Sequence, residues 1–181
     1  MSTLRGDYNK ALDLLEQALK VQPQKNAPIL VELGRVHTAI GNMTTEHIVQ
    51  YFESALKIEP GFPDAMLELA MILSSRSKDP RDQRRALELF EAVLMKDPRN
   101  GAALLAMARH MDFGNSAPLN QIEQMYNRAI EAIDGEARLS RGKPAISPWE
   151  ARLSLASFIE FKRREPNRAG KFYEESVRLA P

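Results

Sequence analysis

The chain has 181 residues, of which 44% are hydrophobic and 27% are charged, a balance typical of folded globular proteins rather than disordered tails. Its 25 basic and 24 acidic side chains nearly cancel, which excludes a strong global attraction to nucleic acid or anionic lipid. Cysteine is absent, which excludes disulfides, thiolate metal sites and a cysteine nucleophile. There is also no apolar run of about 18 residues and no apolar signal core in residues 1–10. We therefore expect a cytoplasmic protein that does not insert into membranes.

Amphipathic helices are predicted along the whole chain, because apolar residues recur at intervals of three and four. Prolines and glycines separate these periodic segments and mark their ends. No segment shows the alternation of apolar and polar residues that a strand requires. The predicted helices cover residues 7–21, 27–40, 44–58, 62–76, 81–96, 100–112, 117–134, 148–164 and 166–179.

Two helical patterns alternate along the chain, which indicates an internal repeat of helix pairs. In one pattern, apolar or small residues follow the first member three, four, seven and eight positions later. Its copies begin at Ala11, Ile48, Ala86, Ile122 and Ala169. The other pattern places a small residue after a large one, so that a neighbouring helix can approach closely. Its copies are Leu33-Gly34, Leu69-Ala70, Met107-Ala108 and Leu155-Ala156.

This alternation resembles the tetratricopeptide repeat (TPR) across nearly the whole chain. The stretch from Gly6-Asp7-Tyr8 to Pro23 is similar to the second helix of such a repeat. The resemblance implies an all-α, right-handed superhelical solenoid of about nine antiparallel helices. We expect TPR-like repeats over 1–134, the first lacking its first helix, then a basic loop over 135–147 and a terminal helix pair over 148–181. That last unit, which contains Trp149 and Tyr173, also resembles the half-a-TPR (HAT) variant.

A partner-binding groove is implied by the resemblance, because the first helix of each pair lines the concave surface in this family. The implied groove residues are Val31, Arg35, Leu67, Met71, Leu105, Arg109, Phe113, Leu153 and Phe161. An apolar strip with two arginines suits an amphipathic helix or an extended peptide that carries acidic residues. The alternative is that Val31, Leu67 and Leu105 belong to the core, in a slightly shifted register.

Nothing in the sequence predicts a catalytic residue, a cofactor or a metal ion. The histidines His37, His47 and His110 lie on separate predicted helices, and none has a second ligand four residues on. His37 replaces a core aromatic residue of the repeat, so we expect it to pack rather than to ligate. Phosphate-binding loops and nucleophile elbows are missing as well.

The sequence therefore favours a non-enzymatic scaffold or adaptor that binds a protein or peptide partner. One alternative is a HAT-like RNA-processing scaffold that contacts RNA through basic clusters. The basic cluster of the last unit is Lys162, Arg163, Arg164, Arg168 and Lys171. Few aromatic residues interleave with these cations, so solvated turns are the favoured interpretation and nucleic acid is a disfavoured partner. Another alternative is a structural TPR protein that self-associates, because both ends lack polar capping helices. The open ends equally suit an excerpt of a longer protein.

Overall fold

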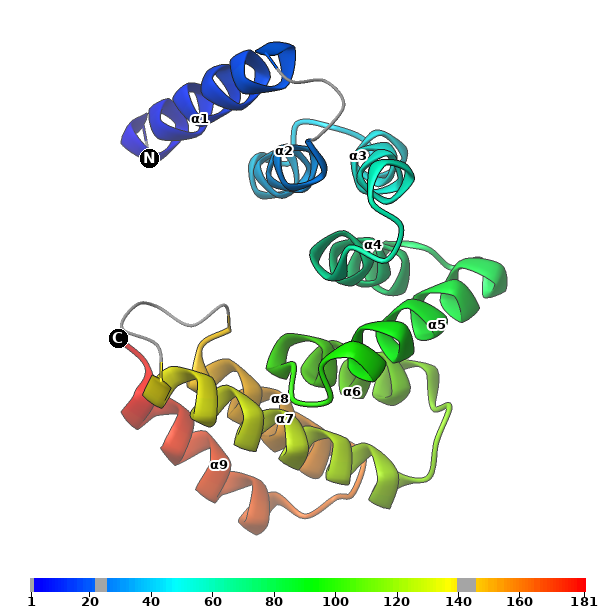
Figure 1. Cartoon of the computed structure of the whole chain (residues 1–181). Helices are drawn as coiled ribbons and strands as arrows, with labels where there is room; N and C mark the ends of the chain where they lie inside the picture. The colour runs from blue at the N-terminus through cyan, green and yellow to red at the C-terminus, as the bar shows by residue number, and fades with distance from the viewer. Residues whose placement is uncertain (1, 22–25, 140–145) are drawn as a thin grey trace. The chain divides into compact units, whose positions relative to one another are not determined.

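The structure is a computed structural model that describes residues 2–21, 26–139 and 146–181. All regular elements in these ranges are helices, which confirms the predicted all-α fold (Figure 1). Most helix boundaries lie within about two residues of the predicted ones. The helices are α1 (Ser2–Val21), α2 (Ala27–Ile40), α3 (Thr45–Ile58), α4 (Pro63–Arg76), α5 (Pro80–Lys96), α6 (Gly101–Gly114), α7 (Leu119–Leu139), α8 (Pro148–Phe161) and α9 (Pro166–Leu179).

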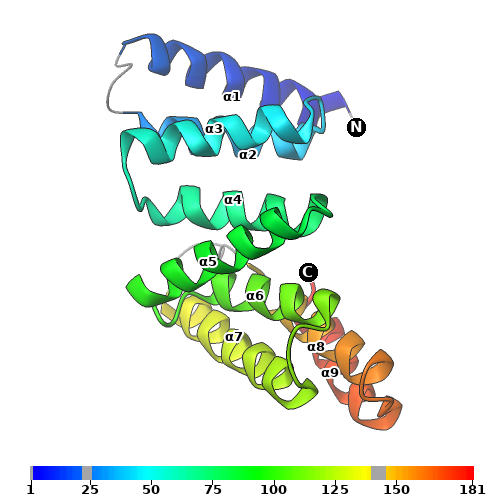
Figure 2. The ribbon, with the colours of Figure 1, turned by 90° about the vertical axis from the view of Figure 1, so that its right-hand side faces the viewer.

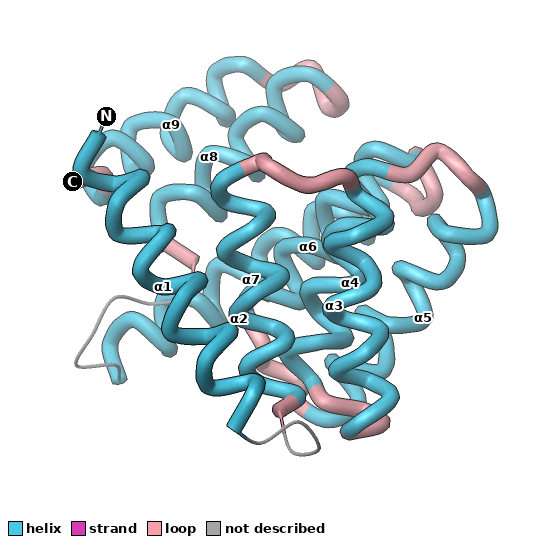
Figure 3. Tube along the Cα trace, turned by 90° about the horizontal axis from the view of Figure 1, so that it is seen from above, coloured by secondary structure: helices cyan, strands magenta, loops and turns pink. Residues whose placement is uncertain are grey.

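The chain divides into two compact units, Met1–Ala92 and Val93–Pro181. The boundary between these two units falls within α5. Where the structure describes the connections between helices, they are short turns, as the loop segments of Figure 3 show. Among the described helices, none combines the length and the apolar character that a bilayer crossing requires.

Unit 1 is built on the close approach of α2 and α3, which lie side by side next to α4 (Figure 2). Gly34 of α2 makes this approach possible, since a Cβ atom there would lie 2.6 Å from the Cε1 atom of Phe52. His37 is buried and stacks on Tyr51, with the ring centroids 5.5 Å apart. The predicted packing role of His37 is therefore confirmed.

Unit 2 packs α6, α7, α8 and α9 around one apolar core. Tyr126 of α7 and Phe158 of α8 meet at its centre, with ring centroids 5.6 Å apart. Gly101 starts α6 against α7, where an added Cβ atom would lie 2.6 Å from Ile133 Cγ1. Small residues at helix crossings thus set the interhelical distance in both units.

The predicted basic loop over 135–147 is wrong in its first part, because α7 continues to Leu139. Gly135 was interpreted as a helix end, yet a single glycine inside a helix costs only about 1 kcal/mol. The extension has a structural role, since the Glu136 carboxylate accepts the Gly101 N–H at 2.9 Å and so caps α6. Residues 140–145, which include Arg141 and Lys143, lie outside the described residues.

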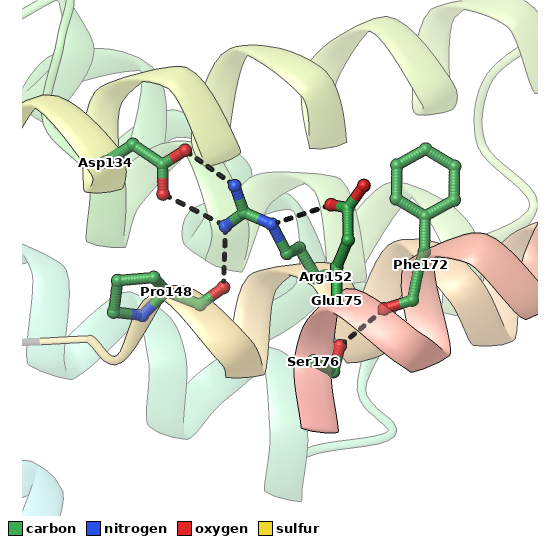
Figure 4. A network of polar contacts seen from close by, with 6 residues as sticks. All are labelled: Asp134, Pro148, Arg152, Phe172, Glu175 and Ser176. Atoms are coloured by element: carbon green, nitrogen blue, oxygen red, sulfur yellow. Dashed lines mark hydrogen bonds and ion pairs between the residues drawn. The ribbon is translucent and has the colours of Figure 1, made fainter. Parts of the chain in front are cut away.

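A half-buried arginine ties three helices of unit 2 together (Figure 4). Arg152 of α8 donates two parallel hydrogen bonds to the Asp134 carboxylate of α7, at 2.9 and 2.6 Å. Its Nε atom donates to Glu175 of α9 at 3.1 Å, and its Nη1 atom also donates to the Pro148 carbonyl oxygen. Planar bidentate pairing of this kind fixes the orientation of both partners.

Candidate partner-binding face on α6 and α8

Helix α6 has its two ends fixed by asparagines. The Asn100 side chain accepts the Ala103 N–H at 2.9 Å and caps the first turn. Asn115 ends the helix in the left-handed conformation, with φ of 46°, which asparagine tolerates better than most residues. These caps fix the residues at which α6 begins and ends.

One hydrogen-bonded contact joins the middle of α6 to α8. The Arg109 guanidinium donates to the Ser154 hydroxyl through Nε at 3.1 Å and through Nη2 at 2.8 Å. The Ser154 hydroxyl in turn donates to the Glu150 carbonyl oxygen one turn earlier. Arg109 is half-buried, and its hydrogen-bond partner is neutral rather than a carboxylate.

A second contact joins the carboxyl ends of the same two helices. Lys162, directly after α8, donates from Nζ to the Asn115 side-chain oxygen at 2.7 Å and to the Asp112 carbonyl oxygen at 3.3 Å. The Asp112 carboxylate also accepts the Tyr126 hydroxyl hydrogen bond at 3.3 Å. Burial raises the pKa of Asp112, and the nearby Lys162 ammonium offsets part of that effect.

Two phenylalanines stand exposed beside these contacts. Phe113 at the end of α6 is 87% exposed, and Phe161 at the end of α8 is 72% exposed. Leu153 lies two turns before Phe161 and is also exposed. We call Arg109, Phe113, Leu153 and Phe161 the α6–α8 face. Its two helices are tied at two levels, so the rings project from a fixed base.

Unit 1 contains the other predicted groove residues, but its arginine, Arg35, already forms ion pairs within the unit. Arg35 of α2 contacts the carboxylates of Glu32 and Glu68 at 2.6 Å each, and Asp64 at 3.7 Å. These neighbours satisfy the guanidinium, so Arg35 has no surplus positive charge for an acidic peptide. Met71 of α4 is half-buried.

Three predicted groove residues are core residues, which corrects their assignment to a partner-binding surface. Val31 is buried in α2, and Leu67 is buried in α4. Leu105 is buried among the core side chains of unit 2. The helical register is therefore slightly shifted, as in the alternative interpretation that assigned these three residues to the core. Because these positions follow the same helical period as the exposed ones, periodicity alone did not distinguish the two faces.

Most of the basic cluster in the last unit is neutralised by carboxylates. Arg163 and Arg168 both contact Glu123 at the start of α7. Arg168 also pairs with Glu165, while Lys162 lies 3.8 Å from Asp112. The cluster therefore joins helix ends together and is a poor match for the free cations that a phosphate backbone needs.

Sequence reasoning missed the residues that hold the face in place, namely Ser154, Asp112, Asn115 and Lys162. Polar side chains of these types are common on solvated helix surfaces, so the sequence did not mark these four as a group, and Lys162 stood out only as part of the basic cluster. The nearest available signal was Asn115, because an asparagine directly after a predicted helix is a frequent left-handed cap. Within the described residues, no group of three or more His, Cys, Asp or Glu side chains is placed to hold a metal ion.

Helix pairs in sequence, with small residues at their crossings, define a helical-repeat protein. No family model matches the chain. It is 28% identical over 85 residues to the photosystem I assembly protein Ycf3 of Rippkaea orientalis (strain PCC 8801 / RF-1). That match covers 46% of this chain and 48% of Ycf3, so it spans about half of the relative's length.

Solved structures similar to the whole chain come from TPR proteins. PilW, a type IV pilus biogenesis factor, has a TM-score of 0.74 at 18% identity, over 100% of this chain and 76% of PilW. The thermophilic TPR protein TTC0263 of Thermus thermophilus has a TM-score of 0.73 at 19% identity, over 99% of this chain and 86% of the TTC0263 chain. MamA of Desulfovibrio magneticus RS-1 has a TM-score of 0.66 at 16% identity, over 98% of this chain and 88% of MamA. The predicted TPR-like fold is therefore confirmed, whereas the HAT-like character of the last unit stays a prediction.

Proposed function

We propose that this chain is a non-enzymatic protein-interaction scaffold, and that the α6–α8 face binds a helix or an extended peptide of another protein. The observation that carries the proposal is the exposure of Phe113 and Phe161. Exposed apolar side chains that gather on one surface are typical of interaction sites, and aromatic residues are enriched at the centre of protein interfaces.

Rigidity supports the same proposal. Arg109 and Ser154 join the two helices at one level, and Lys162 and Asn115 join them at another. A surface that is already ordered loses less conformational entropy when a partner binds. Arg109 adds a specificity element, because its guanidinium hydrogen-bonds a hydroxyl and can also bind a partner's carboxylate.

A role in assembling larger protein complexes agrees with the names of the similar proteins. Ycf3 is named for photosystem I assembly, and PilW for type IV pilus biogenesis. We propose the general role for this chain without transferring either partner. The RNA alternative has less support, because Arg163, Arg168 and Lys162 already contact carboxylates.

Affinity capture from a cell extract, read by quantitative mass spectrometry, tests this proposal. The test variant is Phe113→Ser with Phe161→Ser. The matched control is Met95→Ser with Leu139→Ser, which removes two comparably exposed apolar side chains elsewhere in unit 2. A protein that the wild type and the control retain and the test variant loses is the expected result.

Equal retention by both variants would place the binding site away from the α6–α8 face. Recovery of RNA and its binding proteins alone, removed by moderate salt, would favour the RNA-scaffold alternative. Far-UV circular dichroism of each variant shows whether the helices are intact before the comparison is made.

A further inference from the structure

We propose that an open groove along α7 binds a short extended segment of a partner protein, in which an apolar residue lies between two acidic ones. The groove has a volume of about 540 Å³, which falls within the roughly 300–1,000 Å³ of typical ligand sites. We call it the α7 groove; one wall is α7 from Arg128 to Leu139, and the other is formed by Pro98, Arg99 and Leu104. It shares no residue with the α6–α8 face, so the proposal goes beyond the function proposed above and does not depend on it.

The wall on α7 is a single face of that helix. Arg128, Ala132, Gly135 and Leu139 follow one another at intervals of four and three residues, so they form one row along the helix. The buried residues of α7 lie on another face, against the core of unit 2. The groove therefore follows a face of α7 that the core of unit 2 leaves open.

Gly135 keeps the middle of this row open. A Cβ atom at Gly135 would have no neighbour within 4 Å, whereas one at Gly101 would lie 2.6 Å from Ile133 Cγ1. Helix packing therefore requires glycine at position 101 but not at position 135, although glycine is a poorer helix former than alanine. The space above Gly135, beside Leu104, is where an apolar side chain of the partner fits.

Two arginines supply positive charge at the ends of the α7 groove. Arg128 lies at one end, and both Arg128 and Arg99 are exposed. Arg99 lies towards the other end, because Gly101, two residues later, donates its N–H to Glu136. Neither arginine takes part in an ion pair within the described part of the chain. Each guanidinium is therefore available to bind a carboxylate of another chain through two parallel hydrogen bonds.

The length of the groove sets the length of the segment. The wall from Arg128 to Leu139 is about 16 Å long, at the helical rise of about 1.5 Å per residue. An extended peptide covers this distance with about five residues. The segment that fits therefore has an acidic residue near each end and an apolar residue in the middle. A groove that is long and open suits such a peptide better than a compact small molecule.

Glu131 determines which charge the middle of the segment can carry. It is exposed, lies one turn before Gly135 on the same wall, and takes part in no ion pair among the described residues. An acidic residue in the middle of the segment would be repelled by this carboxylate, whereas an apolar residue would not. The same repulsion disfavours the phosphate backbone of a nucleic acid in the α7 groove.

Selection from a phage-displayed library of random linear peptides tests the proposal. The wild-type chain is the bait, and Gly135→Leu is the counter-selection bait, because its side chain occupies the middle of the groove and its Cβ atom meets no neighbour. The selected peptides should share an apolar residue flanked by acidic ones. By fluorescence polarisation they should bind Gly135→Leu at least about tenfold more weakly than the wild type.

Two controls locate the binding. Gly170→Leu, at a helical glycine of α9 whose Cβ would also have no neighbour within 4 Å, should bind the peptides like the wild type. Phe113→Ser with Phe161→Ser should do so too, because neither residue lines the α7 groove. A library that yields no peptide able to distinguish the wild type from Gly135→Leu would overturn the proposal.

Charge reversal tests the roles of the two arginines. Arg99→Glu and Arg128→Glu should each weaken binding of the selected peptides roughly fivefold at low salt. A peptide with lysine in place of the corresponding acidic residue should regain affinity for the matching variant. Unchanged binding of the original peptides to both variants would refute the assignment of an acidic segment to the α7 groove.

Discussion

The substitution Gly34→Ala should destabilise unit 1, although alanine is the better helix former. Relative to glycine in a helix interior, alanine contributes about 0.5–1 kcal/mol. The added Cβ atom, however, would lie 2.6 Å from Phe52 Cε1 and 2.7 Å from Phe52 Cζ. Phe52 is completely buried, so its ring cannot move out into solvent, and overpacking of about 1–3 kcal/mol should exceed the gain.

Gly170→Ala is the matched control, because a Cβ atom at Gly170 of α9 would have no neighbour within 4 Å. We expect Gly34→Ala to lower the free energy of unfolding by about 1–2 kcal/mol and Gly170→Ala to raise it by about 0.5–1 kcal/mol. Urea denaturation followed by circular dichroism measures both. In a double-mutant cycle, Gly34→Ala combined with Phe52→Leu should lose less stability than the two single changes added together, since the smaller side chain makes room for the added Cβ atom. If Gly34→Ala stabilised the protein as much as Gly170→Ala, the proposed close approach of α2 and α3 would be refuted.

Three further predictions concern single side chains. Arg152→Met should lower stability by about 1–2 kcal/mol in urea denaturation, because it leaves the half-buried Asp134 carboxylate without its bidentate partner; Arg178→Met, at an exposed ion pair, should change little. Asp112→Asn should be more stable than the wild type at pH 7, because burial raises the pKa of Asp112 and its protonated form favours the folded state. This difference should disappear below about pH 3.8, where the unfolded chain is protonated too, and thermal melts across pH 3–8 test it. Ala70→Trp should destabilise by about 1–3 kcal/mol through overpacking, and an unchanged melting temperature would contradict the burial of Ala70.

The helices were predictable because each has a strong apolar period and clear ends. Pro63, Pro148 and Pro166 begin helices in the structure, as proline's fixed backbone angle favours. The small residues Gly34 and Ala70 were correctly interpreted as sites of close helix packing, since both lie at buried positions. Local sequence carries this information, because a helix and its buried stripe are set by residues a few positions apart.

The site was predictable only in part, because exposure on a helix depends on what packs against it. Phe113, Leu153 and Phe161 are exposed as expected, whereas Leu105 is buried four residues before Arg109. Contacts such as Arg109 with Ser154 join residues far apart in sequence, and no periodicity reports them. The end of α7 was missed for a related reason, because Glu136 is stabilised there by the N-terminus of α6.

The most direct test of the central claim is site-specific photo-crosslinking to the captured partner. Because the chain has no cysteine, a single introduced cysteine can carry the photoreactive label at one chosen position. Leu153→Cys places the label on the α6–α8 face, and Met95→Cys places it at an exposed residue elsewhere in unit 2. The account predicts partner adducts from Leu153→Cys that disappear with Phe113→Ser and Phe161→Ser, and few from Met95→Cys. Adducts that form equally from both positions, or that persist without the two phenylalanines, would contradict it.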